Sequence, residues 1–344
     1  MQTLPQPREQ PFAEPIVFAH SGLPAPVEAL EPEEETPTRM GLTEVEERLL
    51  RSIYDLHYLT IVQISRLHYN SESRSSLNYV ASLMKRLEEE HYVQRGFLAR
   101  AVAFGRNPSV FRLATKGINH MQGLGLSPIP KFRPSDPFPS FENLKHTLCV
   151  NDVIIAARRL VTEKPGYTLR EVRHDWMLHH TPVYVPADKR SEGKVAVIPD
   201  AWLDIYGPPP AGKTKEVRMP VHLELDRGTE DTAHSFKPKF AARVAYINGA
   251  YEQFFHTPYV TIAYATTRGQ HRCERMRTWA EEELTRLKRT DDSHFFYFTS
   301  LPTLTDPLTG RDTETLDLDP DTLFLTPVWT TPFDPTPKSL LVDN

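Results

Sequence analysis

The sequence predicts an α+β protein with two folded domains, and the spacing of its apolar residues is the main reason. In residues 41–125 the apolar period changes from that of helices to that of strands and then back to a helix. Residues 141–300 read as a helix, three strands (the second over residues 194–205), a helix, a strand, a helix and a strand, which predicts an α/β domain. Residues 126–140 contain five prolines and are expected to form a stiff, extended linker.

The two ends of the chain differ in composition from these domains. Residues 1–40 are rich in Pro and Glu and have no apolar periodicity, which predicts a disordered acidic tail. Residues 301–344 are rich in Pro, Thr and Asp, with one apolar cluster at 323–325. We therefore expect a mostly irregular acidic tail at the C-terminal end.

The net charge of -5 is unevenly distributed along the chain. Residues 41–290 hold 36 basic and 28 acidic residues, a balance of +8 that suits a core which binds a polyanion. No apolar run is long enough for a transmembrane helix, and no signal peptide is evident. Cys149 and Cys273 are too few for a disulfide framework, so we expect a cytoplasmic protein without membrane contact.

The N-terminal domain is predicted to contain three helices, a β-hairpin and a closing helix. Two helix starts are marked by capping residues, Thr43 with Glu46 and Thr60 with Gln63 or Ser65. The predicted elements are helices from Thr43, from Thr60 and over Ser73–Glu90, strands at 92–95 and 109–113 around a turn at 105–108, and a helix at 115–124. This order predicts a winged helix-turn-helix.

A winged domain of this kind would bind double-stranded DNA through its third helix and its hairpin. Arginine and asparagine side chains read base edges or bind phosphates. The candidate DNA-binding residues are Arg74, Ser75, Asn78, Lys85 and Arg86 on the third helix and Arg95, Arg100 and Arg106 on the hairpin. The alternative is a winged domain that binds another protein and has a basic face that is merely solvated.

Two apolar segments that end in acidic residues indicate a second site. Residues 195–200 end in Asp200, and residues 221–226 contain Glu224 and Asp226. If these segments are neighbouring strands, we expect the three carboxylates to lie close together and to face the first helix of the domain. Carboxylates suit Mg²⁺ and Mn²⁺, and such a metal can activate water against a phosphodiester.

The same acids also allow a structural interpretation. Glu224 and Asp226 point to the same face of a strand, because side chains alternate along it. Two carboxylates on one face repel each other unless a cation lies between them. That cation is either a metal or one of the basic residues Arg227, Arg243 and Lys239.

The order of elements, with Pro-Asp on the second strand and Glu-x-acid on the third, resembles the PD-(D/E)xK nuclease fold. This resemblance implies that Asp200 and Glu224 hold Mg²⁺ or Mn²⁺ and that Asp226 supports the metal. Asp226 stands where the motif has its lysine, so the resemblance assigns the orientation of water to Lys239 on the following helix. The other candidates for this role are Lys237 and Arg227. His146, on the first helix, could also face the acids.

Short motifs along most of the chain resemble a narrower family, the replication-relaxation proteins of plasmids and mobile elements. The motifs are Tyr58-Leu59-Thr60, Gln63-Ile64-Ser65-Arg66-Leu67, Arg112-Leu113-Ala114-Thr115-Lys116-Gly117, His146-Thr147-Leu148, Asn151-Asp152, Ile198-Pro199-Asp200 and Leu223-Glu224-Leu225-Asp226-Arg227-Gly228-Thr229. The resemblance implies DNA processing, with other replication or mobilisation proteins as candidate partners.

Two classes of function remain after these considerations. In the first the protein is a metal-dependent nuclease or nickase, and in the second it is a non-catalytic DNA-binding replication or regulatory factor, or an adaptor. The histidines do not have the spacing of a His-hydrophobe-His relaxase. Gly212-Lys213-Thr214 lacks the upstream glycine of a phosphate-binding loop, so no nucleotide cofactor is expected.

Overall fold

The computed structural model describes residues 41–98, 107–127, 133–188, 191–209, 214, 216–228, 232–302 and 315–341. The predicted acidic tail at residues 1–40 lies outside the described residues, as do Arg100 and Arg106 of the predicted hairpin.

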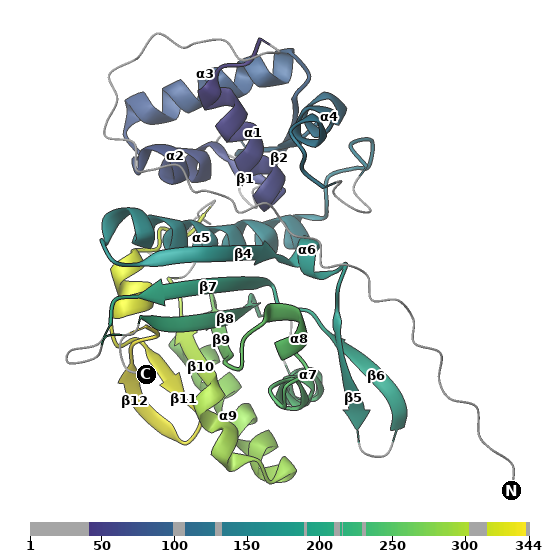
Figure 1. The fold of residues 1–344 in the computed structure, drawn as a ribbon, viewed down its shortest axis with the longest axis vertical. Helices are drawn as coiled ribbons and strands as arrows, with labels where there is room; N and C mark the ends of the chain where they lie inside the picture. The colour runs from purple at the N-terminus through teal and green to yellow at the C-terminus, as the bar shows by residue number, and fades with distance from the viewer. Residues whose placement is uncertain are drawn as a thin grey trace, which may run out of the picture.

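The N-terminal part contains four helices and a three-stranded antiparallel sheet within the described residues (Figure 1). Its elements are α1 (Glu44–Leu56), β1 (Leu59–Thr60), α2 (Ile61–Tyr69), α3 (Arg74–Glu89), β2 (Val93–Phe97), β3 (Ser109–Leu113) and α4 (Thr115–Gly123). Both capping boxes are present, Thr43 with Glu46 before α1 and Thr60 with Gln63 before α2. The strand order is β1-β3-β2, so the short β1 that precedes α2 joins the hairpin.

The C-terminal part is built on a seven-stranded mixed sheet with the strand order β12-β11-β10-β9-β8-β7-β4. Strands β8, β9 and β10 are parallel to one another, and the other neighbours are antiparallel. Its elements are α5 (Phe141–Glu163), β4 (Thr168–His174), α6 (Asp175–Leu178), β5 (Val183–Asp188), β6 (Ser191–Val197), β7 (Ala201–Gly207), β8 (Val217–Asp226), α7 (Ala233–Tyr246), α8 (Glu252–Phe255), β9 (Thr261–Thr266), α9 (Gln270–Leu287), a 3₁₀ helix (Thr290–Phe295), β10 (Phe296–Ser300), a π-helical turn (Asp321–Leu325), β11 (Trp329–Thr331) and β12 (Asp334–Lys338). This mixture of helices and one large mixed sheet confirms the α+β class.

The single strand expected over residues 194–205 is wrong, because two strands of different sheets occupy this region. Strand β6 pairs with β5 in a separate hairpin, and β7 belongs to the large sheet. Residues 198–200 separate them. Pro199 has no backbone N–H to donate to a neighbouring strand. The backbone N–H of Asp200 donates to the oxygen of Leu223 (3.0 Å), and its backbone oxygen accepts from the N–H of Asp175 (3.0 Å).

The C-terminal segment is also more ordered than its composition suggests. Residues 315–341 contribute β11 and β12 to one edge of the sheet and bury several large side chains. Phe324 and Trp329 are 1% and 2% exposed. The expectation of a mostly irregular tail fails here because the apolar cluster around Phe324 packs into the main core rather than remaining in solvent.

Helix α5 lies between the N-terminal part and the large sheet (Figure 1). Leu148 on α5 packs with Val110 and Tyr58 of the N-terminal part. Ile154 of α5 belongs to the core that also contains Leu203 and Leu223 of the sheet. The opposite face of the sheet packs on α7 and α9 through a second, aromatic-rich core. Helix α5 therefore packs against both the N-terminal part and the large sheet.

The described residues 133–140 of the proline-rich segment are held against β3. The guanidinium of Arg112 lies 4.2 Å from the ring centroid of Phe138 and donates to the carbonyl of Pro134 (2.9 Å). A side chain at Gly96 on β2 would come within 2.7 Å of the same ring. Contacts of this kind, rather than proline stiffness alone, hold residues 133–138 in place.

Candidate functional site

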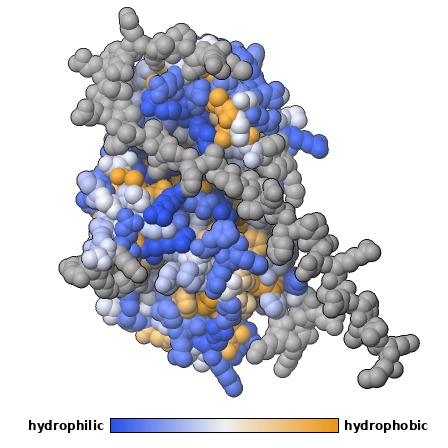
Figure 2. All heavy atoms as spheres, viewed as in Figure 1, coloured by the Kyte–Doolittle hydropathy of each residue, from blue (hydrophilic) through white to orange (hydrophobic). Residues whose placement is uncertain are grey.

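The outward face of α3 carries the candidate DNA-binding residues that are best exposed. Arg74, Ser75, Asn78 and Lys85 are exposed, while Val80 and Leu87 on the other side of the helix are fully buried. In Figure 1, α3 lies on the side of the N-terminal part away from the large sheet. Figure 2 shows that hydrophilic residues predominate on the visible surface of the described chain. The exposed polar side chains of α3 are therefore accessible to a binding partner.

Two of the predicted DNA-binding arginines have acidic partners within the protein. Arg86 binds Glu46, the buried glutamate of the first capping box, and Arg95 binds Glu88 through two contacts, one of 3.0 Å. Burial by itself raises the pKa of Glu46, but the hydrogen bond and charge of Arg86, together with the hydrogen bonds of Thr43, outweigh burial and lower it. Arg86 thus helps to fix α1 against α3, and it differs from Arg74, for which the described residues include no acidic partner.

Asp200 lies just before β7 and faces the first helix of the C-terminal part, as expected. Its Oδ1 is 3.1 Å from Nε2 of His146 on α5, and its Oδ2 accepts a 2.6 Å hydrogen bond from the backbone N–H of Leu225 on β8. The side chains of Asp200 and His146 are 23% and 31% exposed. Burial alone lowers the pKa of His146, but the hydrogen bond and charge of Asp200 outweigh it and raise that pKa.

Glu224 and Asp226 are paired with arginines on the helices that cover the other face of the sheet. Arg243 on α7 makes a bidentate contact with Glu224, with N–O distances of 2.7 and 2.9 Å. Arg272 on α9 contacts both oxygens of Asp226 at 2.9 and 3.0 Å, and the hydroxyl of Thr266 donates to Asp226 at 2.8 Å. Both carboxylates are thereby paired with guanidinium groups, whereas Asp200 faces the imidazole of His146.

The structure therefore does not bring the three acids together as one metal-ready set. Across the part of the chain that the structure describes, no group of three or more His, Cys, Asp or Glu side chains is arranged to hold a metal ion. The expectation that Asp200, Glu224 and Asp226 all face the first helix is met by Asp200 alone, because the other two point toward arginines on α7 and α9.

The basic residues proposed to orient water lie on α7 or beside the end of β8. Lys239 is exposed on α7, whereas Lys237 binds Glu282 at 2.6 Å. Arg227 donates to the backbone oxygen of Glu142 at 2.6 Å and contacts its carboxylate at 3.1 Å. Lys237 and Arg227 are thus engaged with acidic residues.

The sequence interpretation named His146 and Arg243 among several candidates but did not foresee Arg272. His146 was indicated by its place on the first helix. Arg243 was one of three basic residues near the acids in sequence. Arg272 lies 46 positions from Asp226 in the chain, and nothing local marks it as a partner.

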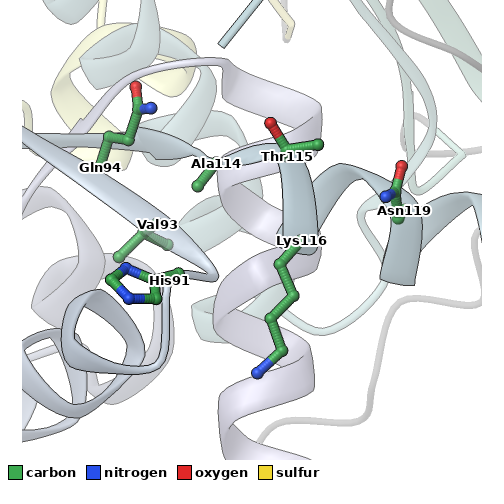
Figure 3. A pocket seen from close by; sticks show the side chains of 7 residues that line it. All are labelled: His91, Val93, Gln94, Ala114, Thr115, Lys116 and Asn119. Atoms are coloured by element: carbon green, nitrogen blue, oxygen red, sulfur yellow. The ribbon is translucent and has the colours of Figure 1, made fainter. Parts of the chain in front are cut away.

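A shallow hollow on the N-terminal part lies apart from the strand-end acids (Figure 3). It is lined by residues of β2 and α4 and of the turn before β2, including His91, Gln94, Lys116 and Asn119. The ammonium of Lys116 is 3.9 Å from the ring centroid of Tyr92 and donates to the backbone oxygen of Glu90 at 3.1 Å. None of the predicted site residues lines this hollow.

Comparison with known proteins identifies one family. The family model described as replication-relaxation matches residues 50–259, which is more than half of the chain and includes α3, Asp200 and Glu224. Searches of curated proteins and of solved structures returned no significant match. None of the helices that the structure describes is long and apolar enough to cross a membrane. The chain belongs to the replication-relaxation family, as its motifs indicated.

Proposed function

We propose that this protein binds duplex DNA during the replication or relaxation of a plasmid or other mobile element, with residues 41–125 acting as a winged helix. The observation that carries this proposal is the exposed polar face of α3, with Arg74, Ser75 and Asn78 at its N-terminal end. Recognition helices contact base edges with their N-terminal residues. Family membership supports a role in replication or relaxation.

The distribution of charge along α3 supports docking by its N-terminal end. Arg74 stands at the first helical position, whereas Glu88 and Glu89 lie in the last turn. Lys85 is 3.7 Å from Glu89, so part of its charge is offset within the helix. Phosphates would be repelled at the acidic end and attracted at the other. The positive end of the helix dipole adds to this preference.

The test is the affinity of the full chain for duplex DNA, measured by fluorescence anisotropy at several salt concentrations. Replacing Arg74 and Asn78 with Ala should cost roughly 1–3 kcal/mol for each base that the variant no longer reads. If Arg74 binds a phosphate instead, the salt dependence of log K should become shallower by about 0.9. Arg170→Ala removes the same charge from an arginine on β4 whose side chain is 59% exposed, and it should leave binding unchanged. Equal binding by the double variant and the wild type would show that α3 is not the docking face.

A second candidate function is a metal-dependent nuclease or nickase, with Asp200, Glu224, Asp226 and Lys239 as the catalytic set. The observation in its favour is the position of Asp200, half-buried at the end of the sheet beside a histidine. The arginine pairs of Glu224 and Asp226 favour the non-catalytic alternative, in which these acids are structural. Incubating supercoiled plasmid with the protein and Mg²⁺ or Mn²⁺ distinguishes the nuclease from the non-catalytic alternative. Nicked or linear product supports the nuclease, and unchanged plasmid supports a binding factor.

A further inference from the structure

His146 and Asp200 form a pair of potential metal ligands that differs from the three-carboxylate set expected from the sequence. His146 is on α5 and Asp200 directly precedes β7, 54 residues away in the chain. We propose that His146 Nε2 and Asp200 Oδ1 are two adjacent ligands of one divalent cation at the end of the large sheet. The remaining coordination positions are left to water and to an oxygen of a bound phosphodiester.

The separation of the two atoms suits this role. Two ligands held about 2.1 Å from a metal, at right angles to each other, lie about 3.0 Å apart. The observed separation of Nε2 and Oδ1 is 3.1 Å. A cation can therefore be bound with little movement of either side chain.

Both groups are held in position and open to solvent. The N–H of Leu225 fixes Oδ2 of Asp200 at 2.6 Å, which leaves Oδ1 directed at the histidine. The side chains of His146 and Asp200 are 31% and 23% exposed, so a hydrated ion can reach them. Glu224 is held by Arg243 in a bidentate contact. The site thus offers two protein ligands and leaves several positions for water and a substrate oxygen, as in Mg²⁺ sites held by one or two carboxylates.

The ligand types indicate which ions should bind. Imidazole nitrogen suits first-row transition metals, whereas Mg²⁺ and Ca²⁺ prefer oxygen ligands; Mn²⁺ binds most weakly in that row, but it also accepts carboxylate oxygen. A site with one imidazole and one carboxylate should therefore bind Mn²⁺ more tightly than Mg²⁺. This inference adds a cation site to the proposed DNA-binding function and does not depend on it, because the metal can be measured without DNA.

The experiment is a calorimetric titration of the full chain with Mn²⁺, followed by pulsed EPR of the bound ion. The wild type should bind one Mn²⁺, with nitrogen modulation from a coordinated imidazole. Even loss of a second-shell partner typically weakens metal binding 10–100-fold, so His146→Gln should weaken it by at least about 10-fold and remove the nitrogen signal. Asp200→Asn should weaken it similarly. His271→Gln, an exposed histidine on α9, is the matched control and should bind like the wild type.

Three results would overturn the proposal. The first is the absence of saturable Mn²⁺ binding by the wild type. The second is unchanged binding by His146→Gln, and the third is bound Mn²⁺ without a nitrogen signal, which would mean a site made of oxygen ligands alone. Thermal melts show whether Asp200→Asn still folds, and if it does not, His146→Gln decides alone. DNA binding measured in EDTA tests the proposed function separately.

Discussion

Truncation of Phe324 to alanine should destabilise the whole protein, although this residue lies in a segment whose composition suggests a tail. Phe324 is 1% exposed and belongs to the core that includes α5 and the central strands. It lines a void of only about 10 Å³ together with Val153, Leu203 and Trp329. The site is therefore closely packed on several sides, and its neighbours on α5 and the sheet cannot easily move inward to fill the space that the ring occupied.

The expected destabilisation is large because the variant gives up both the burial and the packing of the ring. Phe→Ala substitutions in cores cost roughly 3–5 kcal/mol. For a chain of this size, that cost corresponds to a decrease in melting temperature of roughly 6–15 °C. Phe333→Ala is the matched control, because Phe333 belongs to the same segment but is 48% exposed. Its effect should stay within about 0.5 kcal/mol.

The measurement is thermal and urea unfolding followed by far-ultraviolet circular dichroism, with both variants and the wild type under the same conditions. If Phe324→Ala and Phe333→Ala melt alike, the segment does not complete the core and the reasoning is wrong. A change in the urea dependence rather than the midpoint would instead point to an altered denatured or native ensemble.

Two further predictions concern buried charge. Arg243→Met should destabilise the protein by roughly 3–5 kcal/mol, because it removes the guanidinium that binds the carboxylate of Glu224, and adding Glu224→Met should restore much of that stability in a double-mutant cycle. Additive effects would show that the two side chains are not coupled. Burial raises the pKa of Asp152 to about 7, although Gln63 and the N–H of Leu316 donate to it. Because this folded-state pKa lies above the value of about 3.9 in an unfolded chain, the contribution of Asp152 to stability is largest at low pH and is lost as pH rises from about 4 to 7. Melting temperatures at pH 5 to 8 should therefore fall with pH more steeply in the wild type than in Asp152→Asn, and parallel curves would contradict this assignment.

Local signals predicted the N-terminal part well because its helices are specified by neighbouring residues. The capping boxes at Thr43 and Thr60 need only the residue three positions later, and both are present. The spacing that turned Val80 and Leu87 inward also left Arg74 and Asn78 exposed, as expected. A face of a helix can thus be predicted from its own sequence, since its period is fixed by the backbone.

The same approach failed where partners are distant in the chain. The acids at the strand ends were visible in the sequence, but only the tertiary structure shows which cation each of them meets. Glu224 meets Arg243 from the next helix, whereas Asp226 meets Arg272 from the helix after β9. Asp200 turns instead to His146, which precedes it by 54 residues. The spacing of acids and bases along the chain does not contain this information.

Buried polar contacts join the two parts of the molecule more firmly than a linker would. Gln63, the capping residue of α2, donates through Nε2 to the backbone oxygen of Leu148 (2.7 Å) and to Asp152 (2.8 Å), both on α5. Asn151 on the same helix donates to the backbone oxygens of Leu56 (3.1 Å) and Tyr58 (2.6 Å). Gln63 and Asn151 are fully buried. If the two parts separated, these polar groups would lose their hydrogen bonds. Each group that stayed buried without a partner would cost about 1–3 kcal/mol of stability. The proposed docking face of α3 and the His146–Asp200 pair are therefore expected to keep a fixed position relative to each other.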